Sequence, residues 1–134
     1  MIAEDNVINR QILVGYLKKL GYSKDDMILA FDGVEAVQQY EASLSRPPEK
    51  HIDVILMDLW MPNMDGYEAT ETILKMANER GEYLAIMAVT ADITGDSLER
   101  AKETGMKGFI SKPYKVLDIE HLILQHFRKD GLSA

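Results

Sequence analysis

Short apolar runs alternate with longer amphipathic segments along this chain. The clearest run extends from Val54 to Met57 and is unbroken, which is typical of a strand buried on both faces of a sheet. Asp58 follows it directly, and Pro62 and Gly66 in the next segment prevent the strand from extending. We therefore predict a buried strand that ends on a carboxylate and is followed by a loop.

Similar runs predict four more strands, at residues 1–3, 27–30, 85–89 and 105–111, and helical spacing predicts a helix after every strand. The helices are expected at residues 7–20, with Asn6 as the N-cap and Gly21 as the terminator, and at residues 33–44, 67–80, 94–104 and 116–127. The fourth helix has few apolar positions and should pack weakly. The apolar positions at helical spacing are Ile8, Ile12, Leu13, Tyr16, Leu17, Leu20, Val34, Val37, Leu44, Ile73, Leu74, Ala77, Leu98, Ala101, Ile119, Leu122, Ile123 and Phe127.

The regular alternation of strands and helices predicts the fold class. No joint looks like a two-residue hairpin, so the pattern favours an α/β domain, a parallel sheet with helices on both faces. Right-handed crossovers leave few topologies for such a sheet. We expect five strands in the flavodoxin-like (βα)5 order 2-1-3-4-5, forming a single domain over residues 1–134.

Composition narrows the functional classes. The 134 residues carry a net charge of −7, which argues against direct binding to nucleic acid or to an anionic membrane. The longest apolar runs are too short to span a bilayer, and the absence of cysteine fits a reducing compartment. We expect a cytoplasmic or nuclear domain whose three histidines, His51, His121 and His126, lie on the surface.

The beginning of the chain is unusual for such a fold. Only Met1, Ile2 and Ala3 precede the acidic pair Glu4-Asp5, whereas strands are commonly about five or six residues long. We expect the first strand to be truncated and the sequence to be an excerpt from a longer chain.

Polar side chains follow the predicted strands where each of them ends. Glu4 and Asp5 follow the first strand, Asp58 the third, Thr90 the fourth and Lys112 the fifth. In the predicted strand order these ends are neighbours, and ligands of open parallel sheets bind there. Converging carboxylates repel one another, by about 4 kcal/mol for two charges about 4 Å apart at an effective dielectric constant of about 20.

A divalent cation would remove that repulsion. All-oxygen ligation favours Mg²⁺ or Mn²⁺, which is held by one or two carboxylates together with water and phosphate oxygens. Lys112 supplies a positive charge for an anion, and the Thr90 hydroxyl supplies a hydrogen-bond donor. These groups together indicate a phosphoryl-transfer site in which a carboxylate is the nucleophile.

The same residues resemble a known family. Glu4-Asp5-Asn6, Asp58 with Met61 to Gly66, Val89-Thr90-Ala91 and Lys112-Pro113 are similar to the motifs of response-regulator receiver domains, in the same order along the whole chain. The acidic start and the long loop before the third strand resemble receivers of hybrid histidine kinases in two-component phosphorelays. The short first strand departs from the family pattern.

The resemblance implies a role for each residue of the metal site. Asp58 would be the phosphoacceptor. Asp5, Asp58 and the backbone carbonyl of Trp60 would ligate Mg²⁺ directly, and Glu4 would act through water.

The resemblance also implies a switch. Lys112 would bind a phosphoryl oxygen, and the Lys112-Pro113 peptide would be cis. Thr90 would move to the phosphoryl group, Phe109 would turn inward, and small Ala91 would leave room for the group. Trp60 and Asp92 lie where receivers tune the lifetime of the acyl phosphate.

The implied function is acceptance of a phosphoryl group from a histidine kinase core or a histidine-containing phosphotransfer protein, followed by a conformational change and autodephosphorylation. Such a domain catalyses only its own aspartyl phosphorylation and dephosphorylation. One alternative is an interaction module that keeps the fold without being phosphorylated. A flavodoxin-like cofactor binder is disfavoured because no Ser/Thr/Gly-rich loop follows the first strand. A haloacid-dehalogenase-type phosphatase is disfavoured because Trp60 stands where its second Asp would be.

Overall fold

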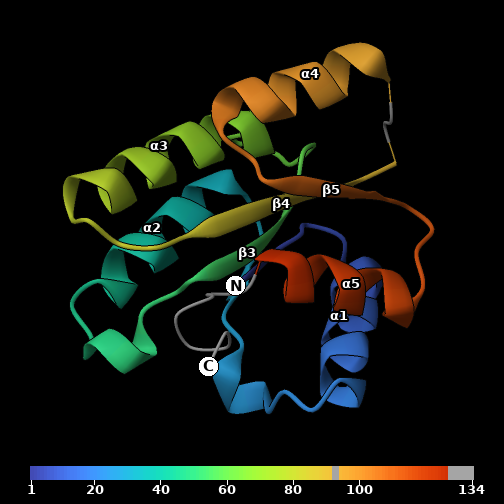
Figure 1. Ribbon diagram of the computed structural model, residues 1–134, viewed down its shortest axis with the longest axis horizontal. Coiled ribbons are helices and arrows are strands. Elements are labelled where there is room, and N and C mark those ends of the chain that lie inside the picture. The colour runs from blue at the N-terminus through green and yellow to red at the C-terminus, as the bar shows by residue number, and fades with distance from the viewer. Residues whose placement is uncertain (92–93, 127–134) are drawn as a thin grey trace.

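The computed structural model describes residues 1–91 and 94–126 and contains a five-stranded sheet with five α-helices (Figure 1). Two short 3₁₀ turns, Lys24–Asp26 and Pro48–Lys50, lie in the connections before β2 and β3. The elements in chain order are β1 (Ile2–Ala3), α1 (Val7–Lys19), β2 (Leu29–Ala30), α2 (Gly33–Ser43), β3 (Val54–Asp58), α3 (Gly66–Glu79), β4 (Ala85–Thr90), α4 (Gly95–Thr104), β5 (Gly108–Ser111) and α5 (Val116–His126).

The sheet has the predicted topology. All neighbouring strands are parallel, and their order is β2-β1-β3-β4-β5. In the register of the sheet Ala3 pairs with Met57, Asp58 with Val89 and Thr90 with Ser111. The carboxyl ends of β1, β3, β4 and β5 therefore meet along one edge, as the alternating pattern predicted.

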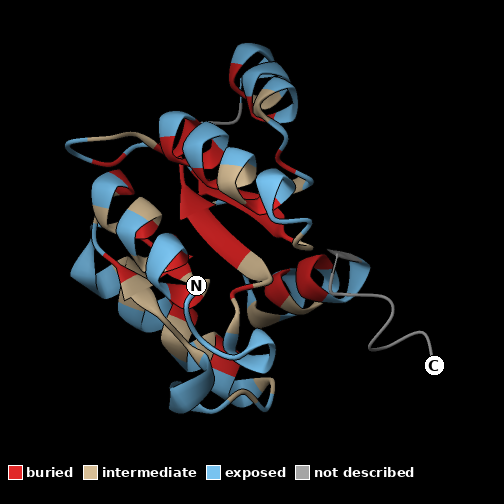
Figure 2. Cartoon of the chain, turned by 90° about the vertical axis from the view of Figure 1, so that its left-hand side faces the viewer, coloured by how far each residue is buried: buried red, intermediate tan, exposed pale blue. Residues whose placement is uncertain are grey.

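The strands alternate their side chains between two cores, one on each side of the sheet. Ile55 and Met57 of β3 pack with α2, α3 and α4, whereas Leu56 packs with α1 and α5. Figure 1 shows these two helix groups on opposite sides of the sheet, and Figure 2 shows β3 and β4 as a mostly buried layer between them. Burial on both faces explains why these strands read as continuous apolar runs.

Helix caps fix where the strand-end loops turn into helices. Asn6, Asp32 and Asp65 each accept a hydrogen bond from the backbone N–H three residues later, at the starts of α1, α2 and α3. After α1 the chain turns at Gly21, whose φ of 101° lies in the left-handed region that glycine adopts without strain. The predicted cap and terminator of the first helix are thus confirmed.

Several helix positions differ from the pattern-based prediction. Ile8 and Ile12 are 68% and 41% exposed, because the first turns of α1 begin at the sheet edge, beyond the two-residue β1. In α2 the buried face is formed by Ala36 and Tyr40, and Val34 is exposed. The small Ala36 lets α2 approach the sheet closely, whereas the apolar spacing indicated Val34, Val37 and Leu44, each one position after a buried residue.

Some element boundaries also differ. β2 begins at Leu29, and β5 begins only at Gly108 because Gly105 ends α4 with a φ of 103°. Met106 lies between them with its side chain in the core. Phe127, predicted to end the last helix, lies outside the described residues.

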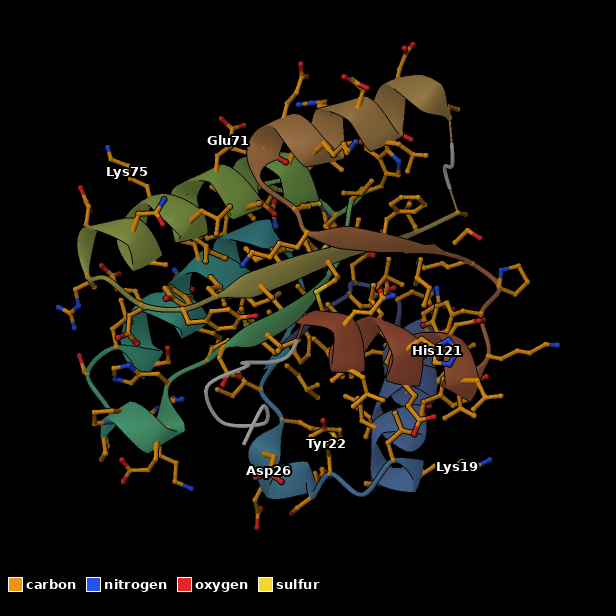
Figure 3. All side chains as sticks on the ribbon, in the orientation of Figure 1. Lys19, Tyr22, Asp26, Glu71, Lys75 and His121 are labelled. Atoms are coloured by element: carbon orange, nitrogen blue, oxygen red, sulfur yellow. The ribbon has the colours of Figure 1, made fainter. Side chains whose placement is uncertain are left out.

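His51 lies at the surface but is only partly exposed. Its side chain is 14% exposed and contacts Glu82, a contact that the sequence pattern did not indicate. The pattern did not reveal that the loop before β3 folds back onto the loop before β4. His121 is exposed on α5, as Figure 3 shows, and the side chain of His126 lies outside the described part of the chain. Within the described residues no helix has the length and apolar character to cross a membrane.

Candidate functional site

Three carboxylates converge at the carboxyl edge of the sheet. Glu4 and Asp5 follow β1, Asp58 ends β3, and one oxygen of each lies within 4.8 Å of the others. Glu4 and Asp58 are buried, whereas Asp5 is exposed. The edge therefore combines two carboxylates removed from bulk water with a third at its mouth.

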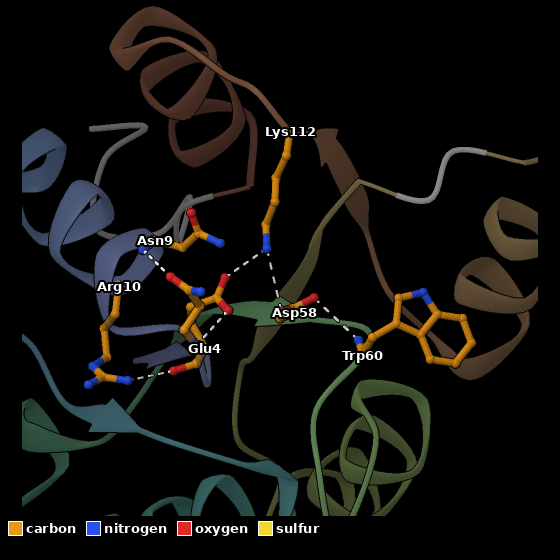
Figure 4. A network of polar contacts seen from close by, with 7 residues as sticks. Glu4, Asn9, Arg10, Asp58, Trp60 and Lys112 are labelled. Carbon is orange, nitrogen blue, oxygen red and sulfur yellow. Dashed lines mark hydrogen bonds and ion pairs between the residues drawn. The ribbon is translucent and has the colours of Figure 1, made fainter.

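Lys112 reaches this cluster from the loop between β5 and α5. Its Nζ donates to Glu4 Oε1 at 2.9 Å and to Asp58 Oδ2 at 3.4 Å (Figure 4). The Lys112–Pro113 peptide bond is cis. One ammonium thus contacts carboxylates from two strands that are more than fifty residues apart in the chain.

Backbone groups orient the same carboxylates. The N–H of Trp60 donates to Asp58 Oδ1 at 3.2 Å, and the N–H of Asn6 donates to Glu4 Oε2 at 3.2 Å. Arg10 in α1 donates to the backbone carbonyl of Glu4 at 2.9 Å. In Figure 4 the indole of Trp60 points away from the carboxylates, so its backbone and not its ring faces the site.

The site carries a surplus of negative charge. Burial raises the pKa of Glu4, and the neighbouring Asp58 carboxyl raises it further, although Lys112 opposes the change. Burial opposes protonation of Lys112, but the hydrogen bond to Glu4 and the charge of Asp58 nevertheless raise the pKa of its ammonium. Apart from burial, both directions reflect the same arrangement: the Glu4 and Asp58 carboxyl groups lie close together and share a single ammonium, so additional positive charge is favourable there.

The donor set fits a hard divalent cation. Among the described residues, the three side chains grouped here each offer a carboxylate oxygen, and two of the three are buried and accept hydrogen bonds from backbone N–H groups. Oxygen-only ligation with room for water suits Mg²⁺ or Mn²⁺ better than it suits softer metals.

The residues expected to form the switch lie in or just after the next two strands of the sheet, β4 and β5. Thr90 ends β4 and is buried, and its neighbour Ala91 is exposed. Phe109 of β5 is 47% exposed, so this conformation holds its ring outward. The other residue expected near the site, Asp92, lies outside the described residues.

Sequence reasoning missed two sets of contacts around the site. Arg10 holds the Glu4 carbonyl and stacks on Phe31, 4.1 Å from its ring centroid. Asn63 donates to Asp32 at 2.7 Å and joins the loops that follow β3 and β2. The contact of Arg10 with the Glu4 carbonyl could have been inferred from the position of Arg10, one helical turn after the Asn6 cap. No sequence feature indicated the contact between Asn63 and Asp32, because the two residues are 31 positions apart in the chain.

Comparison with known proteins agrees with this geometry. The family described as response regulator receiver domain matches residues 1–124. Histidine protein kinase 1 of Candida albicans is 37% identical over 84% of this chain, and the sensor histidine kinase RcsC of Escherichia coli is 35% identical over 84%. Hybrid signal transduction histidine kinase H of Dictyostelium discoideum is 33% identical over 87%. The chain spans only 4%, 10% and 8% of the lengths of these relatives, respectively.

Solved structures show the same likeness. The receiver domain of the histidine kinase CKI1 from Arabidopsis thaliana, complexed with Mg²⁺, is 31% identical, with a TM-score of 0.81 over 92% of this chain and 88% of that one. A chain in the complex of the Saccharomyces cerevisiae phosphotransfer protein Ypd1 with the receiver domain of Ssk1 is 28% identical, with a TM-score of 0.82 over 98% and 89%. Fold, strand-end carboxylates and family match agree, and the chain belongs to the response regulator receiver domain family, the phosphoacceptor modules of two-component phosphorelays.

Proposed function

We propose that Asp58 accepts a phosphoryl group from a phosphohistidine and that the acyl phosphate switches the surface of the domain. The observation that supports this best is the convergence of Glu4, Asp5 and Asp58 on one ammonium, Lys112, at the carboxyl edge of the sheet. The stability of the fold does not explain this convergence, because like charges in a partly buried site destabilise the folded state.

Asp58 suits the role of nucleophile. One of its oxygens forms the new bond to phosphorus while the bond between phosphorus and the histidine nitrogen breaks. The leaving nitrogen keeps the electron pair and takes up a proton from solvent. The Trp60 N–H and Lys112 each contact one Asp58 oxygen, so the carboxylate is oriented before the donor arrives. Attack of water on phosphorus later releases inorganic phosphate and restores the carboxylate.

Asp5, Asp58, the Trp60 carbonyl and, through water, Glu4 are the groups that would hold Mg²⁺. The bound cation would neutralise the charge that collects where the phosphoryl group arrives. Lys112 lies close enough to Asp58 to contact an oxygen of the transferred group. Its raised pKa keeps it charged for that contact at neutral pH.

The conformational response would involve Thr90, Ala91 and Phe109. Thr90 ends the strand next to β3, and Phe109 lies outward in β5, where an inward rotation would change the exposed surface. A phosphoryl group that bonds the Thr90 hydroxyl would favour the rotated state and shift the population toward it.

The protein that donates the phosphoryl group would dock beside the mouth of the site. Val7, Ile8 and Ile12 form an exposed apolar face on α1, which begins two residues after Asp5. We propose that this face contacts a histidine kinase core or a histidine-containing phosphotransfer protein. Because the chain matches short segments of much longer kinases, we further propose a hybrid histidine kinase as the parent, acting in the cytoplasm or nucleus, with residues 1–134 as its receiver domain.

The first experiment measures the intact mass of the domain after incubation with acetyl phosphate and Mg²⁺. We expect a gain of one phosphoryl group that is lost on treatment with alkali. Asp58→Asn should show no gain, since the amide is not a nucleophile. Asp53→Asn, just before the opposite end of β3, is the matched control and should be phosphorylated normally.

An absence of uptake from acetyl phosphate and from a phosphohistidine donor would contradict the proposal. The unphosphorylated interaction module would then be the better interpretation. Uptake that persists in Asp58→Asn would assign the phosphoacceptor to another residue.

A further inference from the structure

The loop between β3 and α3, residues 59–65, is attached to the rest of the fold near both of its ends. At the first attachment the Gly66 N–H donates to the Leu59 carbonyl at 2.9 Å. A Cβ at Gly66 would lie 2.3 Å from the Asp58 carbonyl oxygen, so only glycine allows this approach. This contact closes the loop on the end of its own strand.

The second attachment joins the loop to the start of α2. Asn63 Nδ2 donates to Asp32 Oδ2 at 2.7 Å, and Asp32 Oδ1 accepts from the Glu35 N–H at 2.7 Å. Beside this bond, a Cβ on Gly33 would lie 2.0 Å from the Met64 carbonyl oxygen, so the two backbones touch. Asp32 thus caps α2 with one oxygen and holds the loop with the other.

Asn63 is suited to this position in two ways. Its φ of 68° lies in the left-handed region, which asparagine tolerates better than most residues. Its amide also supplies the N–H that a carboxylate needs, and a hydrogen bond to a charged acceptor is stronger than a neutral one. Within the described ranges, Asn63 is the only residue whose side chain donates a hydrogen bond to Asp32.

Trp60 lies between these two attachments. Its N–H donates to Asp58 Oδ1, and its carbonyl is a proposed cation ligand. We propose that the Asn63–Asp32 hydrogen bond is a positioning contact, which holds the loop so that the Trp60 backbone stays in register with Asp58. The effect on cation binding rests on the proposed function, whereas the effect on the Trp60 N–H does not.

The experiment uses the domain in two states. In the metal-free domain, NMR hydrogen exchange of the Trp60 amide reports its bond to Asp58. Fluorescence of Trp60, the single tryptophan of the sequence, then reports binding during a titration with Mg²⁺. Asn63→Gly removes the side-chain bond but keeps the left-handed backbone, and Asn63→Ala removes both.

We expect several-fold faster exchange of the Trp60 amide in both variants. We also expect a Kd for Mg²⁺ that is roughly tenfold higher, the lower end of what loss of an outer contact costs a metal site. The swapped pair Asp32→Asn with Asn63→Asp should restore both values, since the amide introduced at position 32 can donate to the carboxylate introduced at position 63 while the net charge is unchanged. Ser23→Ala removes a cap that lies before β2, remote from the loop, and should change stability only.

The outcomes separate the two hypotheses. Unchanged Trp60 exchange in Asn63→Gly, or failure of the swapped pair to restore it, would overturn the positioning role. Altered exchange with an unchanged Kd for Mg²⁺ would overturn the link from this contact to the cation. Wild-type protein that binds no Mg²⁺ would refute the proposed function, while altered and rescued exchange would still support the positioning contact.

Discussion

Tyr40 carries a buried hydroxyl that has no hydrogen-bond partner among the described residues. The residue has no exposed surface, and burial raises the pKa of its phenol to about 12. Removing an unsatisfied polar group from a core removes its desolvation cost. We therefore predict that Tyr40→Phe raises the free energy of unfolding by about 1 kcal/mol, as measured by urea denaturation.

Tyr67→Phe is the matched comparison for that substitution. Tyr67 is equally buried, but its hydroxyl donates to the Ser97 carbonyl at 3.2 Å, so this variant should lose stability. A loss of stability in Tyr40→Phe would show that its hydroxyl has a partner in solution.

His51 predicts a pH dependence. Its Nδ1 contacts the Glu82 carboxylate and its Nε2 lies 2.8 Å from the Arg46 carbonyl, so the doubly protonated ring can donate a hydrogen bond from each nitrogen. The hydrogen bond to Glu82 raises the pKa of His51 above its ordinary 6.5. Since the folded state binds this proton more tightly, the stabilisation is complete below pH 6.5 and is lost as pH rises through the folded-state pKa.

The free energy of unfolding, measured as a function of pH, tests the direction of this change in stability. The wild type should lose stability above pH 6.5 relative to Glu82→Gln, which keeps the shape but not the charge of the partner. The difference between the two proteins should therefore shrink toward alkaline pH. A difference that stays constant or grows with pH would exclude His51 as its origin.

At the scale of elements, α4 is the least anchored helix of the α2–α4 layer. Only Ser97 and Ala101 of α4 are buried, whereas α3 buries six residues. Tyr67 links the two helices, because Arg100 stacks on its ring at 4.0 Å and its hydroxyl bonds Ser97. Few buried apolar contacts imply a low free energy of local opening.

We predict that the amides of α4 exchange with solvent faster than those of α3 in native-state hydrogen exchange followed by mass spectrometry. The Tyr67→Phe variant should widen the difference, since it removes one of the two links. Equal protection of the two helices would mean that α4 opens only with the whole domain.

At the scale of the molecule, a cavity of about 610 Å³ lies at the amino edge of the sheet, between the segments that lead into β2 and β3. Ile28, Ile52 and Ile123 line it, and Tyr22 and Asp26, which Figure 3 labels, also border it. Met1 lines this cavity, and its terminal nitrogen donates a hydrogen bond to the Val54 carbonyl at 2.7 Å. Burial lowers the pKa of this amine to about 5.

The geometry predicts that an apolar extension ahead of Met1 continues β1 into the cavity. A variant lengthened by Val-Ile-Val should gain about 2 kcal/mol in the free energy of unfolding, the scale of burying one or two such side chains. It should also lose the rise in stability between pH 5 and pH 8 that the buried amine causes, because the folded state releases that proton first.

A Gly-Ser-Gly extension is the control for this prediction. It removes the buried titratable amine but offers no apolar side chain, so it should abolish the pH dependence with little gain at pH 8. Equal gains from both extensions would show that the cavity does not accept a strand.

Much of the fold could be predicted because it depends on local patterns. The unbroken run before Asp58 reflects burial on both faces, and the caps at Asn6 and Asp65 follow from short-range hydrogen bonds. Where contacts depend on how a helix or loop meets the sheet, prediction was poorer. Ile8 fits an apolar stripe but projects past the edge of the sheet, and His51 pairs with a loop 31 residues away.

The sequence by itself determined the order of strands and helices and the residue type at each strand end, because both are encoded within a few neighbouring positions. Parallel pairing then required Glu4, Asp58 and Lys112 to share one edge. Only the tertiary structure decided which groups orient them, such as Arg10 and the contact between Asn63 and Asp32. Those contacts depend on distances between loops, which no local pattern of polar and apolar residues specifies.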